Sequence, residues 1–492
     1  MERTREYDIV IVGAGISGLS AARYLLSKDS NLNIVILEAT DRVGGRTFTV
    51  PLKTETGTDS WDLGAHWVGR SQTHIMKLIE ELGIKTHQQY LNGRKFLQVG
   101  KDNTVKSYMS DIPTLSLLAL LDLDRAMKKI DSLAKEVDQK EPFACKRGKE
   151  FDGMTMETYI NQTMWIADSK ELMEVAIRGV IGAELSEISF LYFLTYVSAA
   201  GGLKNLVEAT PYTAQEYTLQ GGCQQISLQM AEELGDARII FREPVTSITQ
   251  SHDSVAVTSE SGNIYKCKKI ILAIPPAHIA KIKFDPRLPA VKRELHKRMP
   301  LANYGKVVIT YKEAFWRKSG CSGEVVTNGG PSFDPDCSCG PLCLVFDDTS
   351  ANGNPGLVAF VAGAQLVEWR QLEDEARKTS VLKCLAQFFG DQVEEYIDYA
   401  EKDWESEPYI AGAPVCVAGP GAMRYYAGGL RDPFRCIHFA GTETATVWTG
   451  YMSGAVQAGY RAAIEILLDL RPQTVSGQDL EDNNKPFKHP NT

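Results

Sequence analysis

The sequence predicts an α/β fold in which a doubly wound, largely parallel-sheet domain is interrupted by a mixed α+β domain. Three observations support this prediction. A strand–turn–helix–strand unit opens the chain, strand patterns recur between residues 238 and 274, and a strand followed by a long helix comes near the end. At 492 residues the chain also exceeds what one hydrophobic core usually serves, so at least two domains are expected.

The opening unit has the pattern of a β-strand, an α-helix and a second β-strand. Residues 7–12 are an apolar run typical of a short buried strand, and residues 19–26 have helical spacing of apolar side chains. Residues 33–37 are predicted to form the second strand, which ends at Glu38. A Gly-x-Gly-x-x-Gly turn joins the first strand to the helix, which is the context in which this motif binds a dinucleotide.

The rest of the chain alternates between helical and strand patterns. Residues from about 115 to 200 are helix-rich, and a second mixed region covers about 303–400. Strand patterns return at residues 239–241, 245–248, 255–257, 269–274 and 436–439, and a long helix is expected from about 450 to 470. The simplest architecture is a discontinuous nucleotide-binding domain at 1–90, 220–300 and 401–471, a substrate domain at 91–219 and 301–400, and a polar tail at 472–492.

The composition is that of a soluble globular protein, with 43% hydrophobic and 23% charged residues. The net charge of -9 argues against a nucleic-acid or anionic-membrane partner, since either needs a basic excess. Neither a signal peptide nor an integral membrane anchor is evident, so a cytoplasmic location with reduced cysteines is expected. The cluster of Cys337, Cys339 and Cys343 lacks the C-x₂-C spacing typical of zinc, and no metal site is predicted.

The glycine-rich turn carries chemical detail for a dinucleotide site. Gly13 permits the tight turn, Gly15 lets the backbone approach a pyrophosphate, and Gly18 allows close helix packing. The amides around residues 16–17 present the positive end of the helix to the phosphates. Glu38 can accept hydrogen bonds from both ribose hydroxyls and repels a 2′-phosphate, which favours FAD or NAD over NADP.

The segment after the second strand distinguishes FAD from NAD. Residues 41–47 resemble the glycine–arginine segment by which flavin oxidases extend their nucleotide site. Arg46 there offers a charge-assisted hydrogen-bonding fork to the pyrophosphate. A surface salt bridge is the alternative role for Arg46, but the spacing of Arg46 from Glu38 in the sequence fits a cofactor-binding role better.

From about residue 5 to residue 471 the chain resembles the flavin-containing monoamine oxidases. The landmarks of that family appear in order, at residues 62–69, 220–222, 244–245, 273–276, 305–306, 315–318 and 439–445. The last landmark, followed by residues 448–455, is the most specific one, because polyamine oxidases and L-amino-acid oxidases have related but different sequences in this C-terminal segment. The resemblance implies an FAD-binding, Rossmann-like domain and the oxidation of an amine.

The resemblance also implies individual roles. Lys306 matches a lysine that reaches flavin N5 through a water and can assist O₂ activation. Trp404 matches a tryptophan against the isoalloxazine, and Tyr451 matches one wall of an aromatic sandwich that guides the amine. Gln215 matches a glutamine beside the substrate, and Leu344 matches a gate that tunes the pocket length. Each has a structural alternative: a strand-end surface charge for the lysine, core packing for the aromatic residues, and a structural role for the other two.

The cofactor-binding residues predicted from the glycine motif and from the resemblance are Gly13, Gly15, Ile16, Ser17, Gly18, Glu38, Ala39, Gly45, Arg46, Gly64, Ala65, Val245, Gly441, Glu443 and Met452. Val245 is expected to contact adenine through its backbone. Residues 441–443 lead into the last helix, whose amides can face the flavin. His66 replaces a small residue of the family on the flavin-facing loop, and either contact with cofactor or substrate or a buried structural role is open to it.

Two departures from animal monoamine oxidases bear on the flavin and on the membrane. The family's covalent-flavin cysteine and the tyrosine of the second cage wall fall on Ala413 and Pro414 here, which predicts non-covalent FAD. Cys416 could replace that cysteine only if the loop is re-registered. The second cage wall is therefore unidentified, and the missing membrane helix favours a soluble enzyme.

The expected activity is an FAD-dependent oxidation of primary amines, with secondary amines left open. The substrate carbon gives a hydride equivalent to flavin N5, and O₂ takes up the electrons, so the products are an imine, then an aldehyde and ammonia, with H₂O₂. One alternative is a polyamine or N-substituted amine oxidase, which spermidine turnover would reveal. Another is a flavin-binding scaffold without oxidase activity. The partners expected are a small amine and O₂, and a homodimer is left open.

Overall fold

The computed structural model describes residues 4–100, 102–251 and 254–484. Its first sheet has the strand order β13-β10-β11-β12-β1-β2-β9, and β19 also pairs with β12. These strands are β1 (Thr4–Val12), β2 (Ile34–Leu37), β9 (Ile239–Ile240), β10 (Val245–Gln250), β11 (Val255–Ser259), β12 (Ile264–Leu272), β13 (Lys283–Asp285) and β19 (Ile437–Phe439). The pairings of β1 with β2 and β12, of β2 with β9 and of β12 with β19 are parallel. The predicted α/β, Rossmann-like domain is confirmed.

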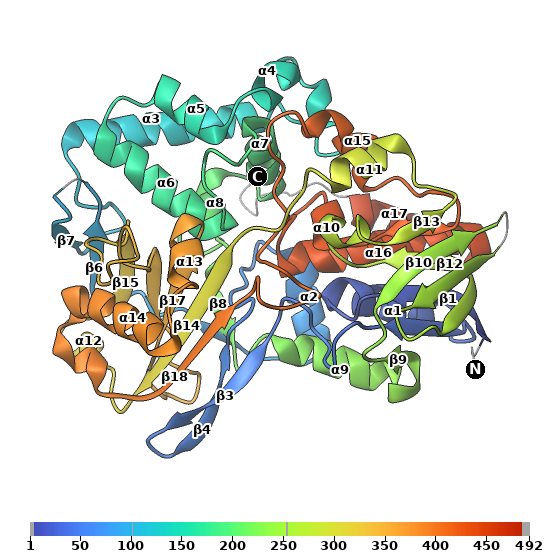
Figure 1. Cartoon of the computed structure of the whole chain (residues 1–492), viewed down its shortest axis with the longest axis horizontal. Coiled ribbons are helices and arrows are strands. Elements are labelled where there is room, and N and C mark those ends of the chain that lie inside the picture. The colour runs from blue at the N-terminus through green and yellow to red at the C-terminus, as the bar shows by residue number, and fades with distance from the viewer. Residues whose placement is uncertain (1–3, 101, 252–253, 485–492) are drawn as a thin grey trace.

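Apolar side chains alternate between the two faces of β1, as the strand period of two requires. Ile9 and Ile11 join one hydrophobic core with helices on that face, whereas Val10 and Val12 join a second core on the other face. The covering helices of the first core are α1 (Ile16–Lys28), α2 (Thr73–Glu81), α9 (Gln224–Leu234) and α16 (Met452–Leu470). Figure 1 shows this half of the molecule on the right, with α1 and α16 side by side.

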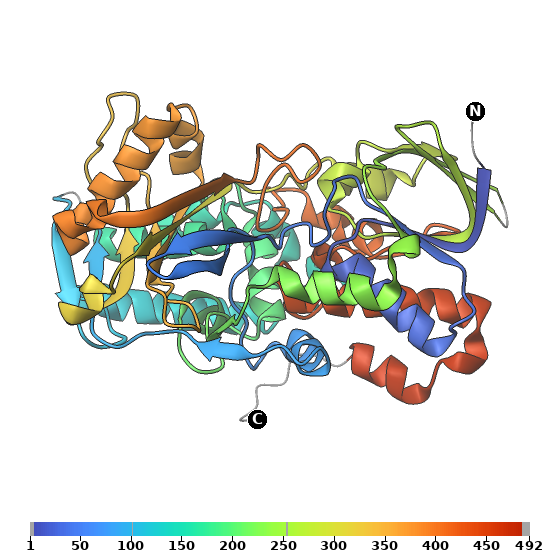
Figure 2. The same ribbon diagram turned by 90° about the horizontal axis from the view of Figure 1, so that it is seen from below.

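The second sheet has the order β18-β14-β17-β16-β15-β6-β7 and lies in the left half of Figure 1. Its strands are β6 (Arg94–Gln98), β7 (Val105–Tyr108), β14 (Tyr304–Tyr311), β15 (Cys321–Thr327), β16 (Leu344–Asp347), β17 (Gly356–Ala362) and β18 (Tyr396–Asp403). On one side of the sheet lie α12 (Phe315–Lys318), α13 (Ala364–Trp369) and α14 (Asp374–Phe389). Figure 2, turned by 90°, shows α14 and the helices that follow residue 115 on opposite sides of this sheet.

The helix-rich region expected at about 115–200 is present and forms its own hydrophobic core. It contains α3 (Leu117–Ala134), α4 (Gly148–Asp152), α5 (Met156–Thr163), α6 (Ala167–Ile181), α7 (Phe190–Ala199) and α8 (Leu203–Val207). Part of its core comes from residues 295–302 and 415–430, around α11 (Ala290–His296) and α15 (Tyr426–Leu430). Two small sheets complete the fold: β3 (Thr49–Thr54) pairs with β4 (Gly57–Asp62), and β5 (Thr86–Gln88) pairs with β8 (Tyr217–Leu219).

The domain division stays a prediction, although the two sheets follow it closely. One strand crosses a proposed boundary, because β18 belongs to the second sheet and runs to Asp403, past residue 400. The beginning of the expected polar tail is folded: α17 (Gly477–Asn484) places Asp479 2.7 Å from Lys28 of α1. Residues 485–492 of that tail lie outside the described residues.

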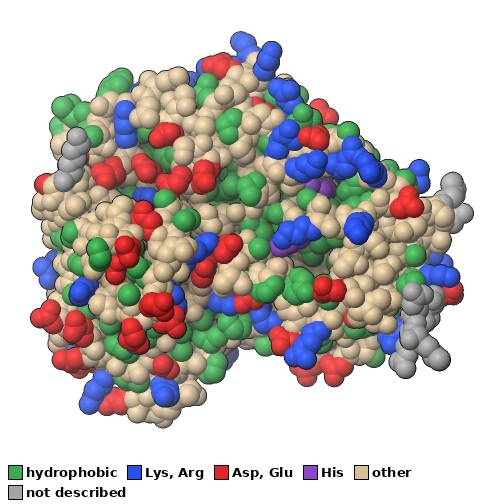
Figure 3. Space-filling model, viewed as in Figure 1, with side chains coloured by type: hydrophobic (Ala, Val, Ile, Leu, Met, Phe, Trp, Pro, Cys, Tyr) green, Lys and Arg blue, Asp and Glu red, His purple; other side chains and the backbone are tan. Residues whose placement is uncertain are grey.

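Two further features concern the charge of the surface and the length of the helices. On the face seen in Figure 3 both signs of charge are present, with many acidic side chains over the half that carries the second sheet. Within the described ranges, no helix combines the length and apolar character needed to cross a membrane.

Candidate active site

A cavity of about 870 Å³ runs from the glycine-rich turn into the second half of the molecule. Gly13, Gly15 and Glu38 line it on the side of α1, and Lys95 and Tyr108 line it on the side of β6 and β7. These elements lie at opposite sides of the molecule in Figure 1, so the cavity is long rather than round. Its volume is at the upper end of what ligand sites usually have, which suits a large cofactor with a small substrate.

The glycine turn is shaped as a dinucleotide site requires. Gly13 has φ +101°, a left-handed conformation, and a Cβ there would lie 2.9 Å from the carbonyl oxygen of Ala273. Gly15 borders the cavity and has no contact closer than 3.9 Å to an added Cβ. Gly18 does not line the cavity; a Cβ there would lie 2.0 Å from the oxygen of Gly13, so it serves the close packing predicted for it.

Glu38 directly follows β2 and is buried beside the turn. Its Oε2 accepts a hydrogen bond from the amide of Ala14 at 2.7 Å, and its Oε1 accepts from the amide and hydroxyl of Thr40 at 2.9 and 2.8 Å. These bonds hold the carboxylate in one orientation at the cavity wall. Because Oε2 accepts one hydrogen bond and has a second lone pair, Glu38 keeps the capacity to accept from a ribose hydroxyl.

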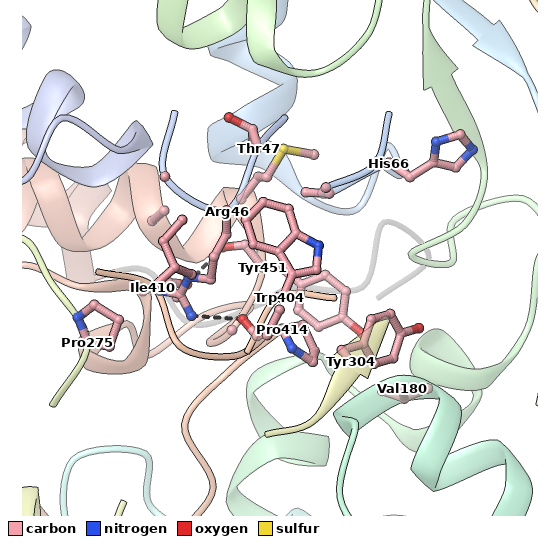
Figure 4. A pocket seen from close by; sticks show the side chains of 18 of the residues that line it. Arg46, Thr47, His66, Val180, Pro275, Tyr304, Trp404, Ile410, Pro414 and Tyr451 are labelled. Atoms are coloured by element: carbon pink, nitrogen blue, oxygen red, sulfur yellow. Dashed lines mark hydrogen bonds between the residues drawn. The ribbon is translucent and has the colours of Figure 1, made fainter. Parts of the chain in front are cut away.

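Arg46 has a partner that sequence reasoning missed. Its Nη1 donates to Glu443 Oε1 at 2.7 Å and to the carbonyl oxygen of Pro414 at 2.8 Å, the latter visible in Figure 4. Glu443 is 2% exposed and does not line the cavity, whereas Arg46 does. Part of the guanidinium fork is therefore used inside the protein, and Glu443 holds Arg46 in place. The predicted contact of Glu443 with the cofactor stays a prediction.

Lys306 lies on β14 and is 1% exposed, so the alternative of a surface charge does not hold. Its Nζ donates to the carbonyl oxygen of Gly64 at 3.2 Å and lies 5.5 Å from the centre of the Phe360 ring. Burial lowers the pKa of Lys306, and the charges of Asp62 and Asp348 oppose this effect. A buried ammonium at a cavity wall is the arrangement expected of a group that acts on a ligand.

Aromatic side chains gather at the same part of the cavity. Trp404 is buried, its indole Nε1 donates to the carbonyl oxygen of Leu63 at 2.9 Å, and Figure 4 shows it beside Tyr451 and Tyr304. The Tyr451 ring lies 6.1 Å from that of Tyr196, at an interplanar angle of 40°. Tyr304 was not predicted. A signal was available, because Tyr304 stands two residues before Lys306 and residues i and i+2 of a strand share a face.

The two predicted substrate residues both line the cavity. Gln215 Nε2 donates to the carbonyl oxygen of Leu206 at 3.0 Å, while its buried Oε1 has no hydrogen-bond partner among the described residues. Leu344 packs against α6, where a Cβ on Gly179 would lie 2.4 Å from its Cδ1. An unused buried acceptor is costly. The predicted contact of Gln215 with a substrate, which stays a prediction, would satisfy this oxygen.

The predicted residues that line the cavity are Gly13, Gly15, Ile16, Ser17, Glu38, Ala39, Gly45, Arg46, Gly64, Ala65, Gln215, Val245, Lys306, Leu344, Trp404, Gly441, Tyr451 and Met452. Ala413 and Pro414 also line it. Among the described residues no cysteine does, and Cys416 is fully buried away from it, with its amide 3.4 Å from Glu443 Oε1. The functional roles assigned to these residues remain predictions.

Comparison with known proteins gives a consistent result. Residues 16–467 match the family model described as flavin containing amine oxidoreductase. A probable flavin-containing monoamine oxidase A of Dictyostelium discoideum is 34% identical, over 94% of this chain and 97% of that protein. The flavin-containing amine oxidase A of Canis lupus familiaris is 35% identical, over 94% of this chain and 85% of that protein.

Solved structures agree with these relatives. The cyclohexylamine oxidase from Brevibacterium oxydans superposes with a TM-score of 0.86 and 29% identity, covering 95% of this chain and all of that chain. A putrescine oxidase bound to putrescine gives a TM-score of 0.86 and 28% identity, covering 94% of this chain and all of that chain.

The fold and the cavity thus define a flavoprotein that oxidises amines. The chain belongs to the flavin-containing amine oxidoreductase family, which confirms the resemblance, the fold class and FAD as the cofactor predicted from the sequence. The glycine cradle, the buried Glu38 and the length of the cavity fit FAD in this chain. The alternative of a different nucleotide cofactor has no support in these observations.

Proposed function

We propose that this enzyme oxidises primary monoamines and binds FAD without a covalent bond. The observation that carries the proposal is the gathering of Lys306, Trp404, Tyr304 and Tyr451 around one buried cavity that is continuous with the nucleotide site. The Dictyostelium discoideum relative, 34% identical to this chain, is named a probable monoamine oxidase, which favours the same substrate class here.

The cavity beyond these aromatic residues favours an uncharged amine. Helices α6 and α8 contribute apolar side chains to its wall, among them Leu172, Met173, Ala176, Leu203 and Leu206. An apolar wall disfavours an ammonium ion, so the amine binds with its nitrogen lone pair available. Tyr451 confines the amine by its ring face, and Gln215 Oε1 can accept a hydrogen bond from its N–H group.

FAD, when bound, supplies the acceptor for the hydride equivalent of the amine and later passes the electrons to O₂. The residues of the chain supply orientation, exclusion of water and charge. Lys306 holds a positive charge where negative charge develops during electron transfer, which stabilises that charge most in a dry site. Its ammonium can also hold or release a proton at Nζ, because burial has lowered its pKa.

Non-covalent FAD is supported by the absence of a cysteine from the described cavity wall. The chain has Ala413 where animal monoamine oxidases attach the flavin, and Cys416 faces Glu443 and Arg46 instead. A cytoplasmic location is proposed as well, because none of the ten cysteines, all of them in the described ranges, forms a disulfide.

A second candidate substrate class is a diamine or polyamine. Asp111, Glu208 and Glu324 line the cavity near β6 and β7 and could bind a distant second cation. Lys95 already lies 3.4 Å from Asp111 and 3.1 Å from Glu324, and Lys204 lies 3.2 Å from Glu208. Because the ammonium groups of Lys95 and Lys204 already pair with these three carboxylates, little acidic charge remains for a second substrate cation, and monoamines are the first choice.

A peroxide-coupled assay with matched amines tests the proposal. A monoamine and a diamine of equal chain length should be compared by kcat/KM, and the monoamine should be the better substrate. In the variant Tyr451→Ala, kcat/KM should fall by roughly ten- to a hundredfold because the ring face is lost, while Tyr451→Phe should stay near the parent. Preference for the diamine would reject the monoamine assignment, and no peroxide with any amine would reject oxidase activity.

A further inference from the structure

His66 separates the large cavity from a second, smaller one. It follows β4 and lines the large cavity together with Gly64, Ala65 and Lys306. The second cavity, of about 20 Å³, is enclosed by residues 59–62, 218–222, 348 and 350–352 and by His66 itself. Of the described residues, His66 alone lines both cavities.

The small cavity leads towards solvent. Ala351, Asn352 and Gln220 on its rim are exposed, and its volume is enough for about one water molecule. Asp59 on the same rim accepts hydrogen bonds from Ser350 Oγ at 2.6 Å and from Asn354 Nδ2 at 2.7 Å. Water in this cavity would therefore touch both a hydrogen-bonded surface loop and the His66 imidazole.

The His66 imidazole lies between two buried carboxylates. Its Nε2 is 3.2 Å from Asp348 Oδ1 and its Nδ1 is 3.9 Å from Asp62 Oδ2, and all three side chains are less than one-tenth exposed. Neither ring nitrogen makes a well-aligned hydrogen bond to a described residue, and Asp348 Oδ2 also has no such partner. Figure 4 shows the ring turned away from Trp404 and Tyr451, so it is placed outside the aromatic part of the cavity. Buried polar atoms without protein partners call for an explanation, such as an ordered water or a catalytic role.

The remaining ionisable neighbours connect this group to Lys306. Lys306 interacts electrostatically with both Asp62 and Asp348, and its Nζ donates to Gly64, two residues before His66. Burial raises the pKa of Asp62, although the charges of His66 and Lys306 oppose this. Cys223 is the other neighbour; burial raises the pKa of its thiol well above the usual value, so it stays neutral.

The net charge of this group of side chains depends on whether His66 is protonated. With Asp62 and Asp348 ionised and Lys306 protonated, the group carries one net negative charge, and protonation of His66 neutralises it. Loss of a proton from Lys306 makes the surroundings of His66 more negative and strengthens its hold on a proton. The two basic groups are therefore coupled across the wall of the flavin-facing cavity.

The reaction requires a proton to be moved in each turnover. Reduction of O₂ to H₂O₂ takes up two electrons and two protons. The two electrons and one proton originate in the C–H bond of the amine, and the second proton equals the one that the amine nitrogen loses when the imine forms. Protein groups or water have to hold that second proton between the two half-reactions.

We propose that His66, with Asp62 and Asp348, forms a proton path between the small solvent-facing cavity and Lys306, and that this path serves the reduction of O₂. His66 and the two carboxylates are positioning and proton-holding residues, while Lys306 is the group at the reacting end. The proposal rests on the amine oxidation proposed above, which is measured separately in the anaerobic reaction.

The first test separates the two half-reactions in the FAD-loaded variant His66→Gln. Reduction of the enzyme by amine without O₂ should stay within about threefold of the parent, while reoxidation by O₂ should slow by about a hundredfold, the low end for a positioned acid or base. His87→Gln on β5, outside both cavities, is the matched control and should leave both rates unchanged. An unchanged reoxidation rate in His66→Gln would overturn the proposal.

The second test observes the ionisation of His66 directly, by NMR of the histidine-labelled, FAD-loaded enzyme. The resonance missing from His66→Gln identifies the ring. Its titration midpoint should move up in Lys306→Met, because a positive neighbour is lost, and down in Asp348→Asn, because a negative one is lost. A midpoint that responds to neither substitution would overturn the coupling, whether or not amine oxidation is confirmed.

Asp348→Asn is a second variant that tests the proton path even if His66→Gln fails to fold. The substitution keeps the shape of the side chain, and the main-chain carbonyl of Asp348 that accepts from Trp61 is retained. Reoxidation should slow several-fold, with its pH dependence displaced to lower pH. If reoxidation keeps the parent rate and pH profile in this variant, the path is excluded.

Discussion

The variant Gly18→Ala should damage FAD binding although Gly18 itself does not line the cavity. The added Cβ would lie 2.0 Å from the carbonyl oxygen of Gly13, and contacts below 3.0 Å are essentially never adopted. The helix and the glycine turn therefore have to separate by about 1 Å. The Gly13 oxygen belongs to the backbone and the position of a Cβ is fixed by the backbone, so no side-chain rotation can relieve the overlap.

The magnitude follows from this displacement. Overpacking of a well-packed site costs about 1–3 kcal/mol, and a backbone clash belongs at the upper end. If FAD binding becomes less favourable by about 3 kcal/mol, the affinity for FAD falls about a hundredfold. Titration of the FAD-free protein with FAD, followed by flavin fluorescence, measures this loss.

A matched control exists in α15. A Cβ on Gly428 would meet nothing closer than 3.7 Å, so Gly428→Ala should bind FAD normally and change the free energy of unfolding by no more than about 1 kcal/mol. Equal FAD affinity in the parent and in Gly18→Ala would refute the reasoning that this glycine is required by the packing of helix against turn.

Three further predictions concern the lysine, the flavin linkage and a buried charge. Lys306→Met should slow reoxidation by O₂ by at least about tenfold in stopped-flow experiments, with anaerobic reduction less affected. Acid precipitation should release FAD from the parent, whereas Ala413→Cys, which puts a thiol in the cavity wall, should retain part of it in the pellet. Burial lowers the pKa of Lys292 to about 8, so the folded protein binds the proton of this ammonium more weakly than the unfolded chain does. The buried charge therefore lowers the free energy of unfolding at neutral pH, and this destabilisation decreases as the pH rises from about 8 to 10. Lys292→Met should therefore raise the free energy of unfolding at pH 7 by about 2 kcal/mol in urea titrations, and by less at pH 9.5.

The parts of the site that are contiguous in the sequence could be predicted from it. Gly13, Gly15, Gly18 and Glu38 belong to one βαβ unit, in which strand order and turn geometry place them together. The structure confirms this unit and the final helix within a few residues. The individual roles taken from the resemblance remain predictions until they are tested by substitution.

The contacts between distant segments could not be predicted in the same way. The Arg46–Glu443 pair joins residues 397 positions apart, and no periodic pattern encodes such a contact. The surroundings of His66 are similar, because Asp348 and Lys306 reach it from two different strands of the second sheet or their loops. Sequence reasoning could identify His66 as a departure from the family pattern, but not its neighbours.

Anaerobic addition of an amine to the purified, FAD-loaded enzyme tests the central claim most directly. The account predicts that a primary monoamine bleaches the visible flavin absorbance, and that admission of O₂ restores it with one H₂O₂ formed per amine oxidised. A protein that takes up no FAD, or a bound flavin that no amine reduces, would contradict it.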